Sequence, residues 1–178
     1  MKILFIKFAL LLFPLVCFTD VTAWKVKSSA ITFKIKNAGV TVDGSFTGLK
    51  ADIRFDPLKP QESSITATVD SRTLNTEMES RDRHTRKPEF LSVDAFPLIT
   101  LQSTRIEKTG PITFVGTFKL TLKGVTKEIT MPFTFMKLPD KTEFKGSFTI
   151  NRRDYGIGGG SMILSEEATV TIVADVTE

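Results

Sequence analysis

Runs in which apolar and polar residues alternate are the feature that most limits how this chain can fold. The longest run places an apolar side chain or glycine at every second position from Ile112 to Leu122. Since successive side chains of a strand point to opposite faces, such a run predicts an antiparallel strand with one apolar and one wet face. Similar runs occur at residues 31–35, 53–55, 65–69, 99–101, 129–135, 144–150 and 170–176, and turn signals occur at residues 37–39, 56–57, 109–111, 123–124 and 139–140. About eight strands at this spacing predict a single all-β domain, a closed antiparallel barrel.

One segment departs from this pattern and predicts a short helix from Glu77 to Arg86. Thr76 and Glu79 fit a capping box, in which Thr76 caps the helix and Glu79 reaches back to it. Pro88 would end the helix. The helix is therefore expected between two strands, where it can close or line one part of the barrel.

Three of the predicted strands share a motif, at residues 42–46, 114–118 and 144–148. In each, a glycine lies two positions from an apolar residue on one side and two positions from a phenylalanine on the other, so all three share one strand face. We expect the glycine to leave a gap, which a packed core avoids and a ligand-holding barrel needs. The alternative for any one glycine is a bend at a barrel corner. The repetition favours a barrel with a hollow interior.

The N-terminal residues 1–23 have the features of a secretory signal peptide. Lys2 and Lys7 give a basic start, residues 8–18 form an apolar run too short to span a membrane, and Val21-Thr-Ala23 offers a cleavage point. Cleavage would leave a 155-residue domain, 24–178, for an exported protein. An uncleaved anchor helix is the alternative. Cys17 suggests a lipoprotein signal, but Val16 stands where such a signal has a small residue.

Composition argues against several classes of function. The full chain has a net charge of +4, spread along the sequence, which differs from the concentrated basic stripe of nucleic-acid-binding proteins. One histidine and, after residue 23, no cysteine do not make a usual zinc site, and no Gly-x-Ser-x-Gly motif is present. We therefore expect no nucleic acid, no metal, no cofactor and no enzymatic activity.

Polar clusters at two places are candidates for contact with a ligand. Helical spacing puts Arg81 and His84 on one face, where they could hold a polar or anionic head group. The alternative is that this charge run is the solvated face of a short helix. The second cluster, 151–157, follows a strand and fits either a turn that locks the last hairpin or a role at the barrel mouth. Its candidate residues are Asn151, Arg152, Asp154 and Tyr155.

These features occur in an order that resembles the YceI-like family of periplasmic lipid-binding proteins. The resemblance is carried by Trp24, Gly44-Ser-Phe46, Arg81-Asp-x-His84, Phe96-Pro-x-Ile99, Gly116, Leu122-x-Gly124-Val-Thr-Lys127 and Asn151-Arg-x-Asp-Tyr-Gly156. It implies a lipocalin-like barrel, an elongated cavity for an isoprenoid or another long amphiphile, and a periplasmic location. It also implies that Arg81, Asp82 and His84 lie on a helix beside the cavity. Thr85 departs from the family pattern, in which a leucine usually follows the histidine.

We therefore predict a periplasmic binding or carrier protein for a long-chain isoprenoid, quinone-like or fatty molecule. The side chains expected to line its cavity are Phe33, Phe46, Phe55, Ile65, Val69, Phe114, Phe118, Leu120, Phe133, Phe144 and Phe148. Transient membrane contact and a homodimer are further partner hypotheses. The alternatives are a lipid-modifying enzyme that uses His84 with Asp82 or Asp154, and a solid, stress-related module that binds proteins.

Overall fold

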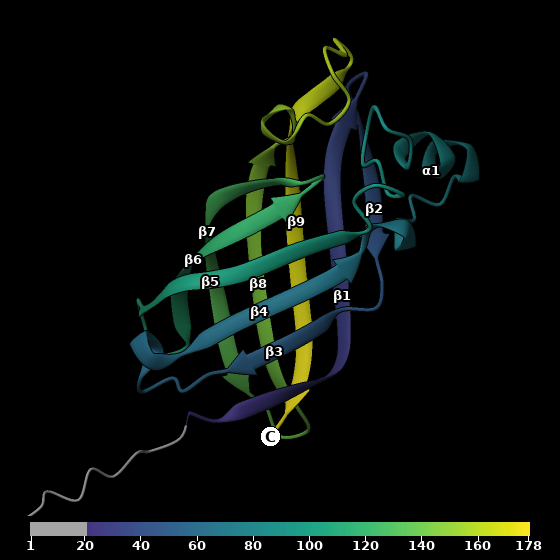
Figure 1. The fold of residues 1–178 in the computed structure, drawn as a ribbon. Helices are drawn as coiled ribbons and strands as arrows, with labels where there is room; N and C mark the ends of the chain where they lie inside the picture. Colours follow the sequence, from purple (N-terminus) through teal and green to yellow (C-terminus); the bar gives the residue numbers. More distant parts are fainter. Residues whose placement is uncertain (1–20) are drawn as a thin grey trace, which may run out of the picture.

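The computed structural model describes residues 21–178 as a β-barrel with one short α-helix (Figure 1). The signal-peptide prediction falls almost entirely on residues 1–20, which lie outside the described residues. The strands are β1 (Ala23–Asn37), β2 (Val40–Phe46), β3 (Lys50–Arg54), β4 (Ser64–Asp70), β5 (Leu98–Lys108), β6 (Thr113–Leu122), β7 (Val125–Lys137), β8 (Thr142–Asn151) and β9 (Leu164–Thr177). The predicted turns fall between strands, except that Asn37 is the last residue of β1, and all strand pairs are antiparallel.

Nine strands close into an eight-stranded barrel because β2 and β3 follow one another along the same edge of β1 and together fill one strand position. β1 pairs with β2 through residues 31–37 and with β3 through Ala23 and Trp24, along the same edge. The other edge of β1 pairs with β9, which closes the cylinder. The break between β2 and β3, at residues 47–49, was not predicted. The closed all-β barrel was, and that prediction is confirmed.

The helix α1 (Glu79–Thr85) is shorter than predicted, and the prediction of a capping box by Thr76 and Glu79 is wrong. Met78 is the N-cap residue and provides no side-chain hydrogen bond. The hydroxyl of Thr76 instead donates to Asp82 Oδ1 at 2.6 Å, and the Thr76 backbone N–H donates to the same oxygen at 2.8 Å. Thr76, which the sequence predicted as the helix cap, is therefore hydrogen-bonded to the buried carboxylate of Asp82 inside the helix.

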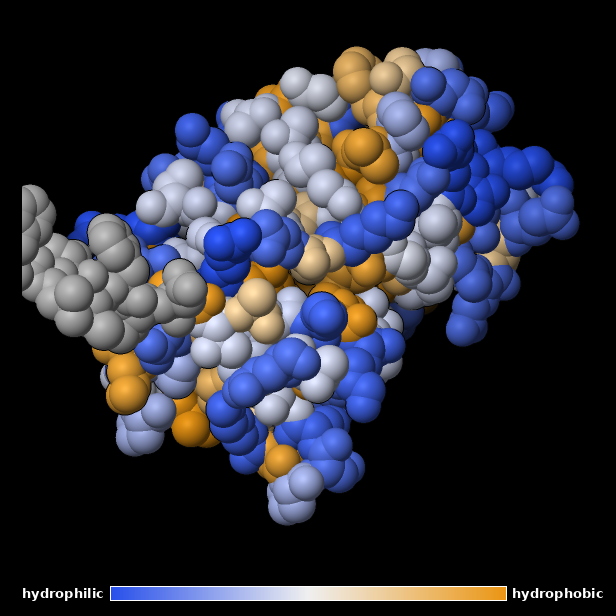
Figure 2. Space-filling view, turned by 60° about the horizontal axis from the view of Figure 1, so that its bottom comes forward, coloured by the Kyte–Doolittle hydropathy of each residue, from blue (hydrophilic) through white to orange (hydrophobic). Residues whose placement is uncertain are grey.

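Three short 3₁₀ turns complete the fold: η1 (Pro60–Glu62), η2 (Ser71–Thr73) and η3 (Arg152–Tyr155). Helix α1, the β1–β2 turn and the loop after η3 all lie at one end of the barrel (Figure 1). On the face shown in Figure 2, hydrophilic residues gather over the lobe on the right, the side on which α1 lies in Figure 1. Across residues 21–178, no helix is both long enough and apolar enough to cross a membrane.

Candidate functional site

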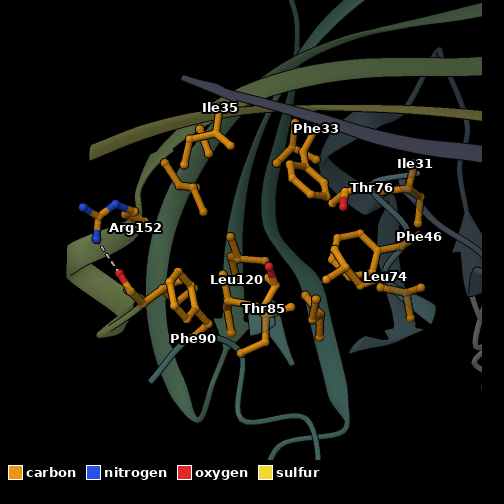
Figure 3. Close-up of a pocket in the computed structure, with 18 of the residues that line it drawn as sticks. Ile31, Phe33, Ile35, Phe46, Leu74, Thr76, Thr85, Phe90, Leu120 and Arg152 are labelled. Carbon is orange, nitrogen blue, oxygen red and sulfur yellow. Dashed lines mark hydrogen bonds between the residues drawn. The ribbon is translucent and has the colours of Figure 1, made fainter. Parts of the chain in front are cut away.

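The interior of the barrel is hollow at the end that carries α1. A cavity of about 350 Å³ lies there, with a wall of aliphatic and aromatic side chains (Figure 3). His84 and Ile163 belong to its wall and are also exposed, so the cavity reaches the surface. We call this half of the barrel the hollow end. Its apolar wall includes Ile31, Phe33, Ile35, Phe46, Val69, Leu74, Phe90, Ile99, Leu120, Phe148, Val170 and Ile172.

The opposite half of the barrel, the filled end, is packed with aromatic rings. Phe55 is 0% exposed and lies at its centre. Its ring centroid is 5.0–5.9 Å from those of Phe114, Phe133, Phe135 and Phe144. These separations are typical of favourable edge-to-face and offset ring pairs. The aromatic cluster therefore closes the floor of the cavity.

The predicted cavity-lining residues divide between the two ends. Five belong to the cavity wall: Phe33, Phe46, Val69, Leu120 and Phe148. Four belong instead to the filled end: Phe55, Phe114, Phe133 and Phe144. Ile65 packs against both groups of core residues, and Phe118 is fully buried in the packed wall, outside the cavity lining. Alternation identified the inward face correctly but could not say how far along the barrel the hollow extends.

The expectation that the three repeated glycines leave gaps is wrong, because side chains already occupy the space. A Cβ added at Gly44 would lie 2.2 Å from the Phe33 ring, and one at Gly116 would lie 2.2 Å from the Phe118 ring. At Gly146 it would meet Met131 Sδ at 2.8 Å. Phe33 and Gly44 face each other in the β1–β2 register, so the ring lies against the bare strand. In the hollow end this glycine makes room for a ring on the wall.

Arg81 and Thr76 form a polar network at one side of the cavity. Both line the cavity, and Arg81 donates from Nε to Thr76 Oγ1 at 2.8 Å and from Nη2 to the Thr76 carbonyl at 2.5 Å. Thr76 is held in turn by the buried carboxylate of Asp82. Among the described residues, Arg81 Nη1 donates no hydrogen bond. The guanidinium is thus fixed in place with donors left for a ligand.

His84 lies one helical turn after Arg81 and also lines the cavity. Its imidazole contacts the Phe90 ring edge-on, with a centroid separation of 4.7 Å. Thr85 lines the cavity too, with its hydroxyl donating to the Arg81 carbonyl at 2.8 Å. Within residues 21–178, neither a hydrogen bond nor an ion pair joins His84 to Asp82 or to Asp154. The structure therefore shows no acid–base pair of the kind that the enzyme hypothesis needs.

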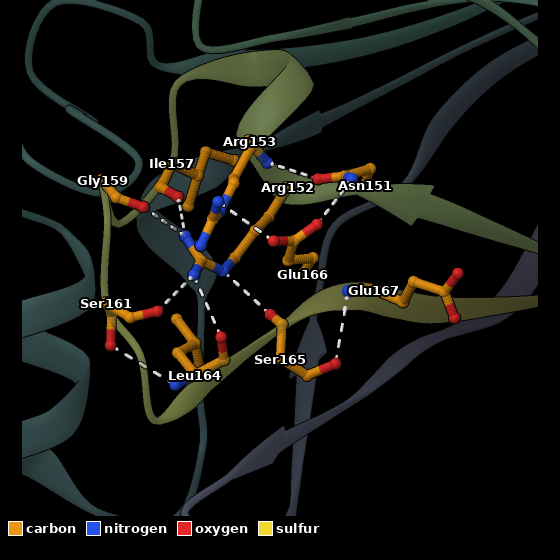
Figure 4. A network of polar contacts seen from close by, with 10 residues as sticks. All are labelled: Asn151, Arg152, Arg153, Ile157, Gly159, Ser161, Leu164, Ser165, Glu166 and Glu167. Atoms are coloured by element: carbon orange, nitrogen blue, oxygen red, sulfur yellow. Dashed lines mark hydrogen bonds and ion pairs between the residues drawn. The ribbon is translucent and has the colours of Figure 1, made fainter.

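Arg152 is the most completely bonded side chain near the cavity (Figure 4). It is 2% exposed and donates to five backbone carbonyls, those of Ile157, Gly159, Ser161, Leu164 and Ser165, at 2.6–3.3 Å. A guanidinium has five N–H donors, so none is left for a ligand. Burial, with the neighbouring Arg153 charge, lowers the pKa of Arg152 from its usual value. Its role in this geometry is to hold the loop at residues 156–164.

The other residues of the second predicted cluster lie outside the cavity wall. Asn151 caps η3 by accepting from the backbone N–H of Arg153 at 2.9 Å. Asp154 lies 3.5 Å from Lys127 on the surface. Tyr155 is buried in the packed wall, where burial raises the pKa of its hydroxyl. These three residues therefore fit a turn in the last hairpin better than a role at the barrel mouth.

Sequence reasoning missed Phe90 and the loop that faces it. Phe90 lines the cavity, and a Cβ added at Gly158 would lie 2.9 Å from its ring. The Gly158 N–H also donates to the Glu89 carbonyl at 2.8 Å. The segment after α1 and the loop at 156–164 therefore meet over the cavity. The available signals were an apolar pair after Pro88 and three consecutive glycines, and neither shows that the two segments touch.

Metal chemistry has no support in the part of the chain that the structure describes. No group of three or more histidine, cysteine, aspartate and glutamate side chains is placed there to hold a metal ion. The charged or titratable side chains of the cavity wall are Arg81, His84 and the fully bonded Arg152, and its other polar groups are the Asn37 amide and hydroxyls such as that of Thr76. The arrangement suits an apolar ligand with one polar end.

Comparison with known proteins gives the same picture of the fold. The profile of the YceI-like domain family matches residues 24–177. A UPF0312 protein from Pseudomonas savastanoi pv. phaseolicola is 35% identical over 136 residues, 72% of this chain and 71% of the relative. A UPF0312 protein from Pseudomonas aeruginosa is 31% identical over 134 residues, 71% of this chain and 70% of the relative.

Two solved structures share this architecture. BcnA from Burkholderia cenocepacia superposes with a TM-score of 0.79 at 23% identity, covering 84% of this chain and 96% of that protein. A polyisoprenoid binding domain from Saccharophagus degradans superposes with a TM-score of 0.65 at 14% identity, covering 89% of this chain and 98% of that domain. At these identities the likeness supports the fold alone.

Proposed function

Because the chain belongs to the YceI-like domain family, we propose that it binds one long-chain amphiphile in the hollow end and sequesters or carries it. The observation that carries this proposal is the cavity itself, about 350 Å³ with an almost wholly apolar wall. Its volume lies at the lower end of the range of roughly 300–1,000 Å³ found for small-molecule sites. Isoprenoid, quinone-like and fatty molecules all have tails that suit such a wall. A solved structure with this fold is a polyisoprenoid binding domain from S. degradans, so isoprenoids are the first ligand class to test.

The floor of the cavity limits how much of a long tail can be enclosed. Because the aromatic cluster around Phe55 fills the other half of the barrel, a tail enters from the α1 end and stops at that cluster. A tail longer than the hollow end would leave part of itself, with its polar group, at the mouth. The site therefore favours a ligand with its polar group at the end of the tail.

Arg81 is the residue that we propose for recognition of the polar group. Burial of each CH₂ group contributes about 0.8 kcal/mol relative to water, but a tail taken from a membrane is already dry. Selectivity must then come from the polar end of the ligand. Arg81 is held by Thr76 and keeps Nη1 donors unused among the described residues, whereas Arg152 has none left.

Native mass spectrometry of gently purified protein is the test of the binding function. We expect a co-purified lipid, or uptake of one molecule of geranylgeraniol per chain when the protein is incubated with it. A bare protein mass both before and after incubation with geranylgeraniol and stearic acid would contradict the proposal. It would instead favour a module that binds other proteins.

The proposed role of Arg81 is tested with a matched pair of variants. Arg81→Ala should weaken retention of a ligand with a hydroxyl or carboxyl end more than retention of a hydrocarbon of equal length. Arg83→Ala is the control, since Arg83 is exposed, pairs with Glu79 at 2.6 Å and lies outside the cavity wall. Equal retention by the two variants would remove Arg81 from the site, and His84→Ala would then be measured in the same way.

A periplasmic location is part of the proposal and depends on the signal features of residues 1–23. We expect the protein in the periplasmic fraction, with Trp24 as its first residue. In the structure, Trp24 is buried and its indole N–H donates to the Phe55 carbonyl at 2.9 Å. N-terminal sequencing of the fractionated protein tests this, and an uncut chain in the cytoplasm would contradict it.

A further inference from the structure

The mouth of the cavity carries an exposed apolar edge built from two segments. Met162 and Ile163, in the loop after η3, are 99% and 64% exposed, and Val40, at the start of β2, is 67% exposed. The Ala38 N–H donates to the Ile163 carbonyl at 2.7 Å, which ties the β1–β2 turn to the loop. Both segments lie at the same end of the barrel (Figure 1). We call the side chains of Val40, Met162 and Ile163 the apolar lip.

The apolar lip is continuous with the wall of the cavity. Ile163 belongs to both, because its side chain lines the cavity and is also largely exposed. Ile35, Val42 and Leu164, from the same two segments, line the cavity beside it. These apolar side chains therefore extend from the inside of the barrel to its outer tip, and Asn37 and Ser161 are the polar residues of the same two segments that also line the cavity.

The charge of the two segments suits a phosphate-bearing surface. Residues 35–42 and 158–164 contain a single charged side chain, the exposed Lys36, and no acidic residue. An apolar tip with a cation beside it can sit at the boundary between headgroups and acyl chains, about 5–10 Å deep. A carboxylate at the tip would oppose that placement, and these segments have none.

The size of the apolar lip argues for a bilayer over a protein partner. A stable protein interface buries about 800 Å² on each partner, from 20–30 residues on each side. Three side chains fall far short of that, and a second copy of the chain would meet the same limit. A bilayer needs no shaped partner surface, so a small apolar tip is enough to engage it.

We propose that the apolar lip docks on the surface of a phospholipid bilayer, so that a lipid tail passes between membrane and cavity without crossing water. This inference rests on the proposed binding function, because it assigns the lip to the loading and release of the same ligand. Insertion of Met162 and Ile163 places the cavity mouth against the acyl region. The tail then moves along one apolar surface.

Vesicle sedimentation of the full chain tests the docking step. The wild-type protein should sediment with vesicles of phosphatidylcholine and phosphatidylglycerol in equal parts. The double variant Val40→Ser/Met162→Ser should bind them at least about tenfold more weakly, since it loses two exposed apolar side chains that lie outside the cavity wall. Leu58→Ser is the matched control, because Leu58 is 83% exposed in the loop between β3 and β4, away from the cavity wall. It should bind like the wild type.

Ligand uptake separates the failure of docking from the failure of the binding function. Geranylgeraniol supplied in detergent micelles should enter the wild type and the double variant equally, whereas uptake from the vesicles should fall in the double variant alone. Equal vesicle binding by all three proteins, or none by the wild type, would overturn the inference. So would a change in oligomeric mass in the double variant, which would assign the apolar lip to a second copy. Loss of micellar uptake in every protein would overturn the proposed function, and docking would then be judged by sedimentation alone.

Discussion

The two ends of the barrel use the same alternating strands but fill their interiors differently. In the filled end, inward positions carry phenylalanines whose rings meet one another around Phe55. In the hollow end, inward positions are mostly aliphatic, and Phe33 lies against the bare strand at Gly44. Alternation therefore decides which side chains face inward, and their size and placement along the strand decide whether space remains.

The polar groups also differ between the ends. At the hollow end, the segments beside the cavity are held by Arg152 and Thr76, two buried polar residues that form several hydrogen bonds each. In the filled end, the partly buried Lys141 lies 2.9 Å from both Glu143 and Asp175. Stability at one end thus comes from ring packing, and the shape of the other end comes from hydrogen bonds to loops.

The largest expected effect is loss of stability from a change in the filled end. Phe55→Ala should lower the free energy of unfolding by about 3–5 kcal/mol, because a fully buried ring leaves a cavity among four others. Phe46→Ala should lower it less, by about 1–2 kcal/mol, since Phe46 already borders open space. Urea unfolding measures both. Equal losses would mean that the two ends are packed alike.

Next in size is the loss of the Arg152 network. Arg152→Met should lower the free energy of unfolding by about 2–4 kcal/mol and expose the loop at 156–164 to proteases, because five carbonyls lose their donor. Arg152→Lys should not rescue it, since an ammonium cannot reproduce the planar fork of five donors. The neighbouring Arg153→Met should change stability by less than about 1 kcal/mol, because it loses only a surface ion pair with Glu166. If Arg152→Met changed neither the free energy of unfolding nor the protease sensitivity of the loop, Arg152 would not be what holds the loop in place.

A pair of glycine variants should separate stability from cavity space. Gly44→Ala displaces the Phe33 ring from the cavity wall, so it should reduce ligand uptake as well as stability, the latter by about 1–3 kcal/mol. Gly116→Ala displaces Phe118, which is fully buried outside the cavity lining. It should lower stability and leave the amount of bound ligand unchanged. Equal uptake by the two variants, measured by native mass spectrometry, would argue that the ring position does not define the cavity.

The smallest effect expected is on acid stability at the hollow end. The side-chain hydrogen bond from Arg72 is the main reason that the pKa of Asp70 falls from 3.8 to about 2. A carboxylate with a lowered pKa stabilises the fold above its unfolded-state pKa, and the stabilisation is lost as the pH falls through the folded value. Asp70→Asn should therefore be slightly less stable than wild type at neutral pH, and most of that difference should be lost near pH 2. Urea unfolding at both pH values checks this, and a difference that persists in acid would assign it to another cause.

Much of the fold was predictable because strand alternation is a local property. The inward face of β6, from Phe114 to Leu122, follows directly from every second residue, as do the turns between strands. That β2 and β3 share one strand position was not predictable, because it depends on how β1 pairs with both of them. The helix was located, but its cap was not, since Asp82 competes for Thr76 only once the helix has formed.

The candidate site was predictable only in part, because its shape is set by contacts between distant segments. Helical spacing placed Arg81 and His84 together, and both line the cavity. Whether Gly44 leaves a gap depends on the register that puts Phe33 opposite it, which no local pattern reveals. The same holds for Arg152, whose acceptors become neighbours only when the loop after η3 folds back.

A crystal structure of the protein with geranylgeraniol tests the central claim most directly. We predict one ligand in the hollow end, with its tail against Phe46 and Leu120, its hydroxyl near Arg81 and its far end stopped at the ring of Phe55. A ligand bound outside the barrel, or one that threads through the filled end, would contradict the account.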